Sequence, residues 1–513
     1  MNGADALIET LCDNGVTACF ANPGTSEMQF VAALDREPRM RPVLCLFEGV
    51  ATGAADGWGR MTGTPACTLL HLGAGYANGG ANLHNARRAG TPLVNVIGDH
   101  ATYHRQFDAP LNSDIAGWAA PNSLWVKSAE TADEVGPLAA EAVQASFGAP
   151  GGCASLILPA DSAWNEASAK GPVLSRPVRA KVSDADIQAM ARRLKAAAKP
   201  VILMGGSCCG EAGVQAAGRL KAAGFRVMTD TFVARLARGA GRFAPDRMLY
   251  FGEMAMEDLK GVDLMVLVET VEPAAFFAYP SRPSLLVPEG CEAVSLGDKS
   301  IDGPAALVAL ADALGASEAA PVEPLDLPAA PTGGLDPYKI GAAIARHMPD
   351  NAIISDDAVT AGLPIFQSTR NARPHDWLML TGGAIGQGIP LAVGAAVACP
   401  DRKVLSLNGD GAAMYTVQGL WTIAREKLDV TTVVFANHVY RILGIEMGRT
   451  GAANPGPAAK RLLDLGDPRI DWVSLVGGLG VEAVRCATAE EFDTAMAHAM
   501  TTPGPHFIEA VLG

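Results

Sequence analysis

Asn408-Gly409-Asp410-Gly411-Ala412-Ala413-Met414 directly follows a short β-branched run, Lys403 to Asn408. A helical stretch from about Tyr415 to Lys427 comes next, and then a second apolar run that ends just before Asn437. Strand, turn, helix and strand in this order predict a βα unit of a parallel sheet. Because the carboxyl ends of adjacent parallel strands meet at one edge, we expect Asp410 and Asn437 to lie close together.

The residue types at this edge favour a metal and a diphosphate. Mg²⁺ binds oxygen ligands and usually keeps phosphate oxygens among them, so Asp410, Asn437 and the backbone carbonyl of Val439 are the candidate metal ligands. Gly409 and Gly411 let the backbone N–H groups that open the following helix, at Ala412, approach a diphosphate. A Gly-Asp-Gly sequence alone is also a common turn. Other parts of the chain must therefore show whether this one binds a metal and a diphosphate.

The same alternation of buried strands and Ala-rich helices runs through the whole chain. Two Pro- and Ala-rich stretches, 167–182 and 316–335, interrupt it and predict extended linkers. They leave three blocks, residues 1–166, 183–315 and 336–513. The sequence therefore predicts an α/β protein with three doubly wound parallel-sheet domains.

Composition excludes several classes of protein. The 513 residues are 49% hydrophobic and 18% charged, which argues against disorder. The net charge is −14 and no Lys/Arg run occurs, so we expect no nucleic-acid partner. Apolar runs are all shorter than the ~18 residues of a membrane span. The ten cysteines are scattered without C-x-x-C spacing, so we expect buried, reduced thiols and a cytoplasmic protein.

Three further stretches lie in the first block: Asn22-Pro23-Gly24-Thr25-Ser26-Glu27, Phe47-Glu48-Gly49-Val50-Ala51, and Leu70-His71-Leu72-Gly73-Ala74-Gly75-Tyr76-Ala77-Asn78-Gly79. They resemble the pyrimidine-binding domain of thiamine diphosphate (ThDP) enzymes of the pyruvate oxidase, acetolactate synthase and benzoylformate decarboxylase superfamily. The Gly-Asp-Gly sequence followed by Asn437 resembles the diphosphate and metal motif of the same enzymes. The resemblance covers the whole chain and implies a pyrimidine domain, a middle domain and a diphosphate domain, in that order.

The resemblance implies roles for individual residues. Glu48 is the residue that activates the cofactor: it hydrogen-bonds the far ring nitrogen of the aminopyrimidine, so that the cofactor's own amino group removes the C2 proton of its thiazolium ring. The apolar run from Leu44 to Phe47 is expected to keep Glu48 out of water. Asn78 is a further cofactor-binding candidate. Ile385 is the candidate wedge that bends ThDP, and the carbonyl of Gly383 is the candidate acceptor for the amino group.

Substrate-side residues distinguish branches of the family. Thr25 and His71 occupy positions where benzoylformate decarboxylase carries a Ser and a His that handle the substrate carboxylate and relay protons. Acetolactate synthases do not typically carry this His, whereas Asn112-Ser113-Asp114-Ile115-Ala116-Gly117-Trp118 is closer to the acetolactate synthase branch. The segment Glu269 to Pro280 corresponds to a loop that reaches over the active site in relatives, where its aromatic residues form either a substrate wall or part of the core.

The function that the resemblance implies is ThDP- and Mg²⁺-dependent decarboxylation of a 2-oxo acid, followed by protonation or by ligation to a second carbonyl. An acetolactate synthase-like carboligase is the first interpretation, and a benzoylformate decarboxylase-type lyase is the alternative. A 2-hydroxyacyl-CoA lyase lacks support, because no basic C-terminal tail is present. A non-catalytic structural or regulatory relative is the remaining alternative.

Two more expectations concern the cofactor and the assembly. The Gly-rich turn Gly205-Gly206-Ser207-Cys208-Cys209-Gly210 lacks the G-x-G-x-x-G pattern, so we expect no FAD. In the family the pyrimidine domain of one subunit faces the diphosphate domain of another. We therefore expect at least a homodimer, with a homotetramer as the usual assembly.

Overall fold

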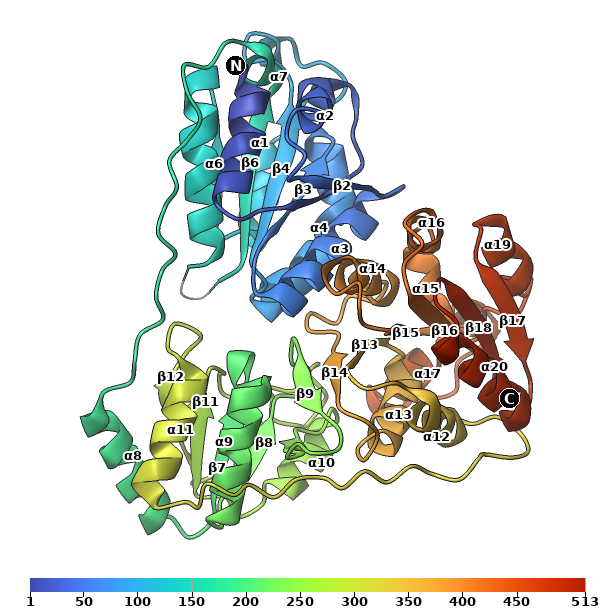
Figure 1. The fold of residues 1–513 in the computed structure, drawn as a ribbon. Helices are drawn as coiled ribbons and strands as arrows, with labels where there is room; N and C mark the ends of the chain where they lie inside the picture. The colour runs from blue at the N-terminus through green and yellow to red at the C-terminus, as the bar shows by residue number, and fades with distance from the viewer. Residues whose placement is uncertain (149–150, 513) are drawn as a thin grey trace.

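The computed structural model describes residues 1–148 and 151–512. It contains three β-sheets, each covered by helices, and the three domains surround a common centre (Figure 1). The predicted α/β fold with three parallel sheets is confirmed. Extended segments connect α7 to α8 and α11 to α12, where the two linkers were expected, and they run along the outside of the molecule (Figure 1).

The first sheet has six parallel strands in the order β2-β1-β3-β4-β6-β5. Helices α1 and α6 pack together on one face, and α3 and α4 pack together on the other. The strands are β1 (Ala18–Ala21), β2 (Arg41–Leu44), β3 (Ala66–Leu70), β4 (Leu93–Asp99), β5 (Trp125–Ser128) and β6 (Cys153–Pro159). The helices are α1 (Gly3–Asp13), η1 (Thr25–Glu27), α2 (Met28–Leu34), α3 (Glu48–Thr62), α4 (Leu72–Ala89), η2 (Arg105–Phe107), α5 (Ile115–Ala119), η3 (Ala120–Asn122), α6 (Ala132–Ser146) and α7 (Ala160–Trp164).

The second sheet has five parallel strands in the order β10-β8-β7-β11-β12. Its strands are β7 (Pro200–Met204), β8 (Arg226–Thr229), β10 (Asp246–Arg247), β11 (Leu264–Val268) and β12 (Glu292–Gly297). Its helices are α8 (Asp184–Ala196), η4 (Gly206–Cys209), α9 (Glu211–Ala222), α10 (Gly252–Asp258) and α11 (Gly303–Leu314).

The third sheet has seven strands in the order β17-β18-β16-β15-β13-β14-β9. Its edge strand β9 (Leu236–Arg238) comes from the middle segment and pairs antiparallel with β14, a pairing that the sequence did not predict. The other strands are β13 (Ala352–Asp357), β14 (His375–Leu378), β15 (Val404–Gly409), β16 (Val430–Ala436), β17 (Glu482–Cys486) and β18 (His506–Val511). The helices are α12 (Pro337–His347), η5 (Val359–Ala361), α13 (Gly362–Ser368), α14 (Gly388–Ala398), α15 (Asp410–Tyr415), α16 (Gly419–Arg425), α17 (Arg441–Arg449), α18 (Pro457–Arg461), α19 (Trp472–Gly478) and α20 (Ala489–Thr501).

Helices α3 and α14 join the first and third domains. A Cβ atom on Gly57 would lie 2.1 Å from the carbonyl oxygen of Leu391, and one on Gly394 would lie 1.7 Å from that of Ala54. Glycines at these positions therefore let the two helices approach to backbone contact. Buried residues of both domains form one continuous apolar cluster around this contact.

The structure also shows the state of the cysteines and the length and polarity of the helices. All ten cysteines are free thiols, eight of them buried, while Cys291 and Cys399 are half-buried. Among residues 1–148 and 151–512, each helix is too short or too polar to cross a bilayer.

Candidate active site

Glu48 lies at the first position of α3 with only 5% of its surface exposed. Asn78 Nδ2, on α4, donates a hydrogen bond to Glu48 Oε2 at 3.0 Å. A Cβ atom on Gly75 would lie 2.9 Å from Glu48 Oε1, so α4 can approach this closely only because position 75 is glycine. The apolar run before Glu48 was expected to keep its carboxyl group out of water, but Leu46 in that run is 46% exposed. Helix α4 covers the carboxyl group instead.

His71 precedes α4 and is paired with a carboxylate that the sequence did not single out. Its Nδ1 lies 2.9 Å from Glu27 Oε2, and the Glu27 side chain is fully buried. Glu27 also accepts hydrogen bonds from the backbone N–H of Gly24 at 2.7 Å and from the Ser26 hydroxyl at 2.6 Å. A carboxylate that accepts three hydrogen bonds fixes the proton of His71 on Nδ1 and leaves Nε2 as the free ring nitrogen.

Thr25 and His71 were both expected on the substrate side, and the hydroxyl group in contact with His71 belongs to the residue after Thr25. Thr25 is exposed in η1, whereas the Ser26 hydroxyl lies 3.5 Å from His71 Nδ1. Glu27 could have been found from the sequence, because a carboxylate two residues after Thr25 lies in the same quoted turn. Its pairing with His71, 44 residues away, required the structure.

Glu48 and His71 belong to one site. A Cβ atom on Gly75 would lie 2.9 Å from Glu48 Oε1 and 3.4 Å from His71 Cβ, so both residues adjoin the same point of α4. Glu48 comes from the first residue of α3 and His71 from the turn after β3. The close packing of α3 against α4 therefore places a buried carboxyl group beside a half-exposed imidazole.

Asp410 and Asn437 follow the carboxyl ends of the adjacent parallel strands β15 and β16. Asp410 Oδ1 accepts a hydrogen bond from the backbone N–H of Gly411 at 2.9 Å, and its Oδ2 accepts one from His438 N–H at 2.7 Å. Asn437 Oδ1 accepts from Val439 N–H at 3.0 Å. Burial raises the pKa of Asp410, and a divalent cation beside the carboxylate would offset this effect.

Backbone groups around Asp410 fit a diphosphate and a metal ion. The Cβ position of Gly409 faces open space, whereas a Cβ on Gly411 would lie 2.2 Å from the Tyr440 ring. Ala412 is buried in the first turn of α15. The Val439 carbonyl accepts a hydrogen bond from Arg441 N–H at 2.8 Å and retains a second lone pair. These oxygen atoms are ligands that Mg²⁺ accepts, and the open space at Gly409 leaves room for a diphosphate beside the N–H groups that open α15.

The Gly-rich loop before α14 carries the candidate wedge. Gly383 and Gly386 have φ values of +74° and +92°, which other residues rarely adopt. Asp357 Oδ2 accepts hydrogen bonds from Gly386 N–H at 2.8 Å and Gly388 N–H at 3.2 Å, and burial raises the pKa of Asp357 to about 7. Ile385 lies half-buried within this fixed loop.

Side chains of the first domain hold the same loop. Asn85, two turns beyond Asn78 on α4, donates to the Ala384 carbonyl at 2.8 Å and accepts from Ala384 N–H at 3.2 Å. Arg60 pairs with Asp56 at 2.6 Å, both fully buried, and donates to the Met379 carbonyl at 2.7 Å. The pyrimidine-type and diphosphate-type domains are therefore positioned by hydrogen bonds as well as by helix packing.

Aromatic residues of the middle domain reach this loop. A Cβ atom on Gly383 would lie 2.4 Å from the Phe276 ring, so Phe276 lies directly against the glycine. Phe276 packs with Phe232, Tyr250 and Phe277 at ring-centroid distances of 5.8, 5.4 and 5.1 Å. Phe276 and Phe277 are 41% and 53% exposed, which is typical of a wall facing a site rather than of a core.

The Gly-rich turn of the middle domain is occupied by an acidic side chain. Glu269 accepts hydrogen bonds from Ser207 N–H at 2.6 Å, from the Ser207 hydroxyl at 2.7 Å and from Gly303 N–H at 2.9 Å. A carboxylate thus takes the N–H groups that a nucleotide phosphate would use. The absence of FAD stays a prediction.

Comparison with known proteins assigns the family. Residues 1–118 match "Thiamine pyrophosphate enzyme, N-terminal TPP binding domain" and residues 360–510 match "Thiamine pyrophosphate enzyme, C-terminal TPP binding domain". The chain is 50% identical to the "Putative acetolactate synthase large subunit IlvX" of Mycobacterium tuberculosis, covering 100% of this chain and 99% of that protein. It is 28% identical to the benzoylformate decarboxylase of Pseudomonas aeruginosa over 98% of this chain and 97% of that protein.

A solved structure agrees with these matches. The thiamine diphosphate-dependent 4-hydroxybenzoylformate decarboxylase of Rhodococcus jostii RHA1 superposes with a TM-score of 0.88 at 25% identity, covering 100% of this chain and 99% of that one. Two family domains in the expected order, a full-length relative at 50% identity and this shared fold lead to one conclusion. The chain belongs to the thiamine pyrophosphate enzyme family, among relatives of acetolactate synthase and benzoylformate decarboxylase.

Proposed function

We propose that this protein is a ThDP- and Mg²⁺-dependent enzyme that decarboxylates a 2-oxo acid and then protonates the product, releasing an aldehyde. The observation that carries the proposal is the Glu27–His71 pair beside Glu48. When bound, ThDP supplies the thiazolium that accepts the electron pair left by CO₂. The protein's own residues must hold the cofactor, exclude water and deliver protons.

Each part of the site has a task in this proposal. Glu48, oriented by Asn78, would hold the aminopyrimidine ring of the cofactor and share a proton with its far ring nitrogen. Asp410, Asn437 and the Val439 carbonyl hold Mg²⁺, and the N–H groups that open α15 face the diphosphate. Ile385 and the Gly383 carbonyl would contact the bound cofactor.

The substrate side has a proton donor and an apolar wall. In its protonated form His71 can deliver a proton from Nε2 while Glu27 accepts the hydrogen bond from Nδ1–H, as expected of a histidine that acts as a general acid. Phe276 lies against Gly383, where it would shield the reacting atoms from water and contact an apolar substituent. The substrate class that fits is therefore a 2-oxo acid with an apolar or aromatic substituent.

Carboligation is the second candidate outcome. The observation that favours it is the 50% identity to the protein named "Putative acetolactate synthase large subunit IlvX". In that case a second carbonyl compound, rather than a proton from His71, would complete the reaction.

The experiment compares donors and products. Purified protein with ThDP and Mg²⁺ is incubated separately with pyruvate and with benzoylformate, and CO₂ and the organic product are identified. Benzaldehyde from benzoylformate supports the proposal, and acetolactate from pyruvate supports the second candidate. Absence of CO₂ from both substrates, in protein shown to bind ThDP, contradicts both.

We also propose that the enzyme acts as a homodimer or a larger homo-oligomer. Apolar side chains beside the two halves of the site are exposed in the single chain: Leu46 at 46%, Met414 at 39% and Tyr415 at 55%. Leu46 lies two residues before Glu48, and Met414 lies in the same helix as Asp410. A partner subunit that covers both would bury them. Sedimentation of the active enzyme as a monomer would contradict this proposal.

A further inference from the structure

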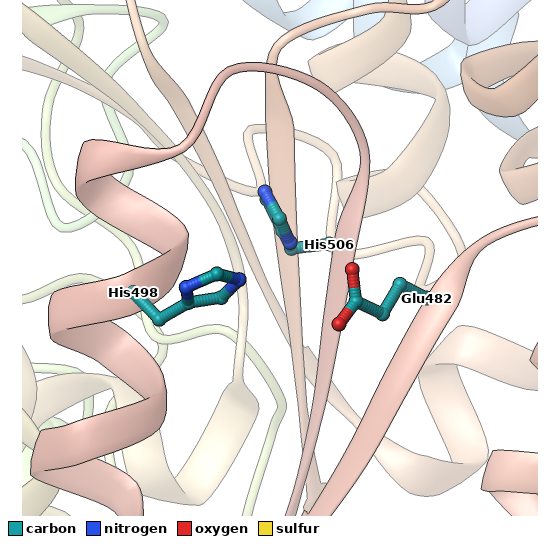
Figure 2. Close-up of side chains that lie close together, drawn as sticks. All are labelled: Glu482, His498 and His506. Atoms are coloured by element: carbon teal, nitrogen blue, oxygen red, sulfur yellow. The ribbon is translucent and has the colours of Figure 1, made fainter.

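Two histidines and a glutamate lie close together near the amino-terminal ends of the last two strands of the third sheet, away from the residues of the candidate active site. The potential ligand atoms of Glu482, His498 and His506 all lie within 4.8 Å of one another. Figure 2 shows the three side chains close together, coming from β17, α20 and β18. In the sequence these residues are 16 and 8 positions apart, a spacing that matches no short metal-binding motif.

The secondary structure fixes this arrangement. Glu482 and His506 are direct partners in the parallel pairing of β17 with β18, so their side chains project from the same face of the sheet. Helix α20 packs over the same two strands and presents His498 from its last turn. The three residues line a surface cavity of about 660 Å³ between α20 and the sheet.

Hydrogen bonds leave one nitrogen of each ring available to a metal. His506 Nε2 lies 3.0 Å from the carbonyl oxygen of Thr502, so Nε2 carries the proton and Nδ1 keeps its lone pair. His498 Nδ1 lies 3.4 Å from the Thr502 hydroxyl, which leaves Nε2 free. A backbone carbonyl that orients a histidine in this way is the usual second contact of a metal-binding imidazole.

The charges around the cavity favour a cation. Glu490 and Glu491 line the cavity together with Glu482. Arg485 also lines the cavity, but its guanidinium is paired with Glu509 at 2.7 Å and with Asp471 at 3.2 Å. Lys403 is paired with Asp429 at 2.5 Å and donates to the Thr502 carbonyl at 2.9 Å, so both positive charges are compensated. The carboxyl-terminal end of α20 adds the negative end of the helix dipole.

We propose that Glu482, His498 and His506 bind one Zn²⁺ ion at this edge of the third sheet. Two imidazoles and a carboxylate form a donor set that Zn²⁺ accepts, and a water molecule completes the four ligands. Ligands of a tetrahedral ion lie about 3.4 Å apart, given Zn–ligand distances of about 2.1 Å. The exposed side chains of Glu482 and His498 can close to this distance by rotation, while His506 stays fixed by Thr502.

The ion has a structural role in this proposal. His506 is the first residue of β18, whereas Asp410 follows the last residue of β15, so the two sites lie at opposite edges of the sheet. A Zn²⁺ ion would join the edge strand β17, its neighbour β18 and the covering helix α20. Glu482, His498 and His506 lie outside the candidate active site, so Zn²⁺ binding there is independent of the proposed function.

The test measures Zn²⁺ binding to the whole protein. Tag-free protein in buffer with ThDP and Mg²⁺ is titrated with Zn²⁺ by calorimetry, and the metal content after dialysis is measured by mass spectrometry. We expect one Zn²⁺ per chain and a rise in the unfolding temperature when Zn²⁺ is added. Glu482→Gln and His498→Gln should each weaken binding at least tenfold and remove the rise in unfolding temperature.

Glu490→Gln is the matched control, because it removes the same charge from the same cavity without removing a proposed ligand. It should bind Zn²⁺ within about twofold of the unaltered protein, which separates coordination from simple attraction of a cation. All three substituted residues are exposed, so the variants are expected to fold, and circular dichroism checks this. No saturable Zn²⁺ binding by the unaltered protein, or equal binding by all variants, would overturn the proposal.

Discussion

His71 Nδ1 lies 2.9 Å from Glu27 Oε2, and the fully buried carboxylate holds the imidazole in one orientation at the start of α4. The Cβ atom that Gly24 lacks would lie 2.2 Å from His71 Nδ1, and the one that Gly98 lacks would lie 1.7 Å from Glu27 Oε1. Two glycines therefore make room for the pair. This arrangement orients the free Nε2 of His71 for proton transfer beside Glu48.

The first prediction concerns this pair. His71→Ala should lower kcat for decarboxylation by about 10²- to 10⁴-fold, the usual contribution of a positioned proton donor. Glu27→Gln should cause a smaller loss and should change the pH profile of kcat, because His71 remains but loses its charged partner. Steady-state kinetics from pH 5 to 9 measure both. His347→Ala, on α12 of the third domain, is the control, and activity of His71→Ala within twofold of that control would show that His71 is not the proton donor.

The second prediction concerns cofactor binding at the third domain. Asp410→Asn removes the negative ligand while keeping an oxygen, so Mg²⁺-dependent binding of ThDP should weaken at least tenfold, or about 1.4 kcal/mol. Calorimetric titration with ThDP in the presence and absence of Mg²⁺ measures the effect. Asp401→Asn, in an exposed turn, should bind ThDP like the unaltered protein. Equal Mg²⁺ dependence in Asp410→Asn would remove this residue from the metal site.

The third prediction concerns substrate choice. Phe276→Ala should raise KM for benzoylformate about 3- to 10-fold relative to KM for pyruvate, because an aromatic contact over Gly383 is lost. Phe277→Ala is the matched control, since Phe277 is more exposed and packs against Phe276 in a T-shaped contact. The ratio of kcat/KM for the two substrates reports the change. Equal ratios in the two variants would assign Phe276 to the core.

The fourth prediction follows from Asp357. Burial raises the pKa of this carboxyl to about 7 in the folded protein, above its ordinary value of 3.8. The folded state therefore binds a proton that the unfolded state has lost, and stability declines as the pH rises from about 4 through 7. Asp357→Asn cannot ionise, so it does not lose this stability at high pH. The free energy of unfolding of the variant minus that of the unaltered protein should therefore be larger at pH 8 than at pH 5. Urea unfolding at the two pH values measures this difference, and an equal difference at both would contradict the assigned shift.

Much of the fold could be predicted from the sequence, because βα alternation is local. The two apolar runs that end before Asp410 and Asn437 form the strands β15 and β16, as their sequences predict. The helix expected from 415 to 427 was only partly correct: α15 ends at Tyr415 and α16 begins at Gly419. The Thr416 hydroxyl between them donates to the Gly386 carbonyl at 2.8 Å, a tertiary contact that helical periodicity does not reveal.

Long-range pairings explain what the sequence could not show. Strand β9 is only three residues long, and nothing in its composition indicates that it joins the sheet of another domain. The hydrogen bond from Arg60 to the Met379 carbonyl spans 319 residues, and that from Asn78 to Glu48 joins two helices. Asp410 and Asn437 were predictable because strand ends place them together, whereas the Glu27–His71 pair depends on the packing of two separate turns.

The most direct test of the account is Glu48→Gln. The variant keeps the size and burial of the side chain but cannot share an acidic proton with the aminopyrimidine. It should bind ThDP and Mg²⁺ with the affinity of the unaltered protein, within about threefold, yet release CO₂ from its best 2-oxo acid at least 100-fold more slowly. CO₂ release at the unaltered rate by a ThDP-bound Glu48→Gln enzyme would contradict the central claim that Glu48 activates the cofactor.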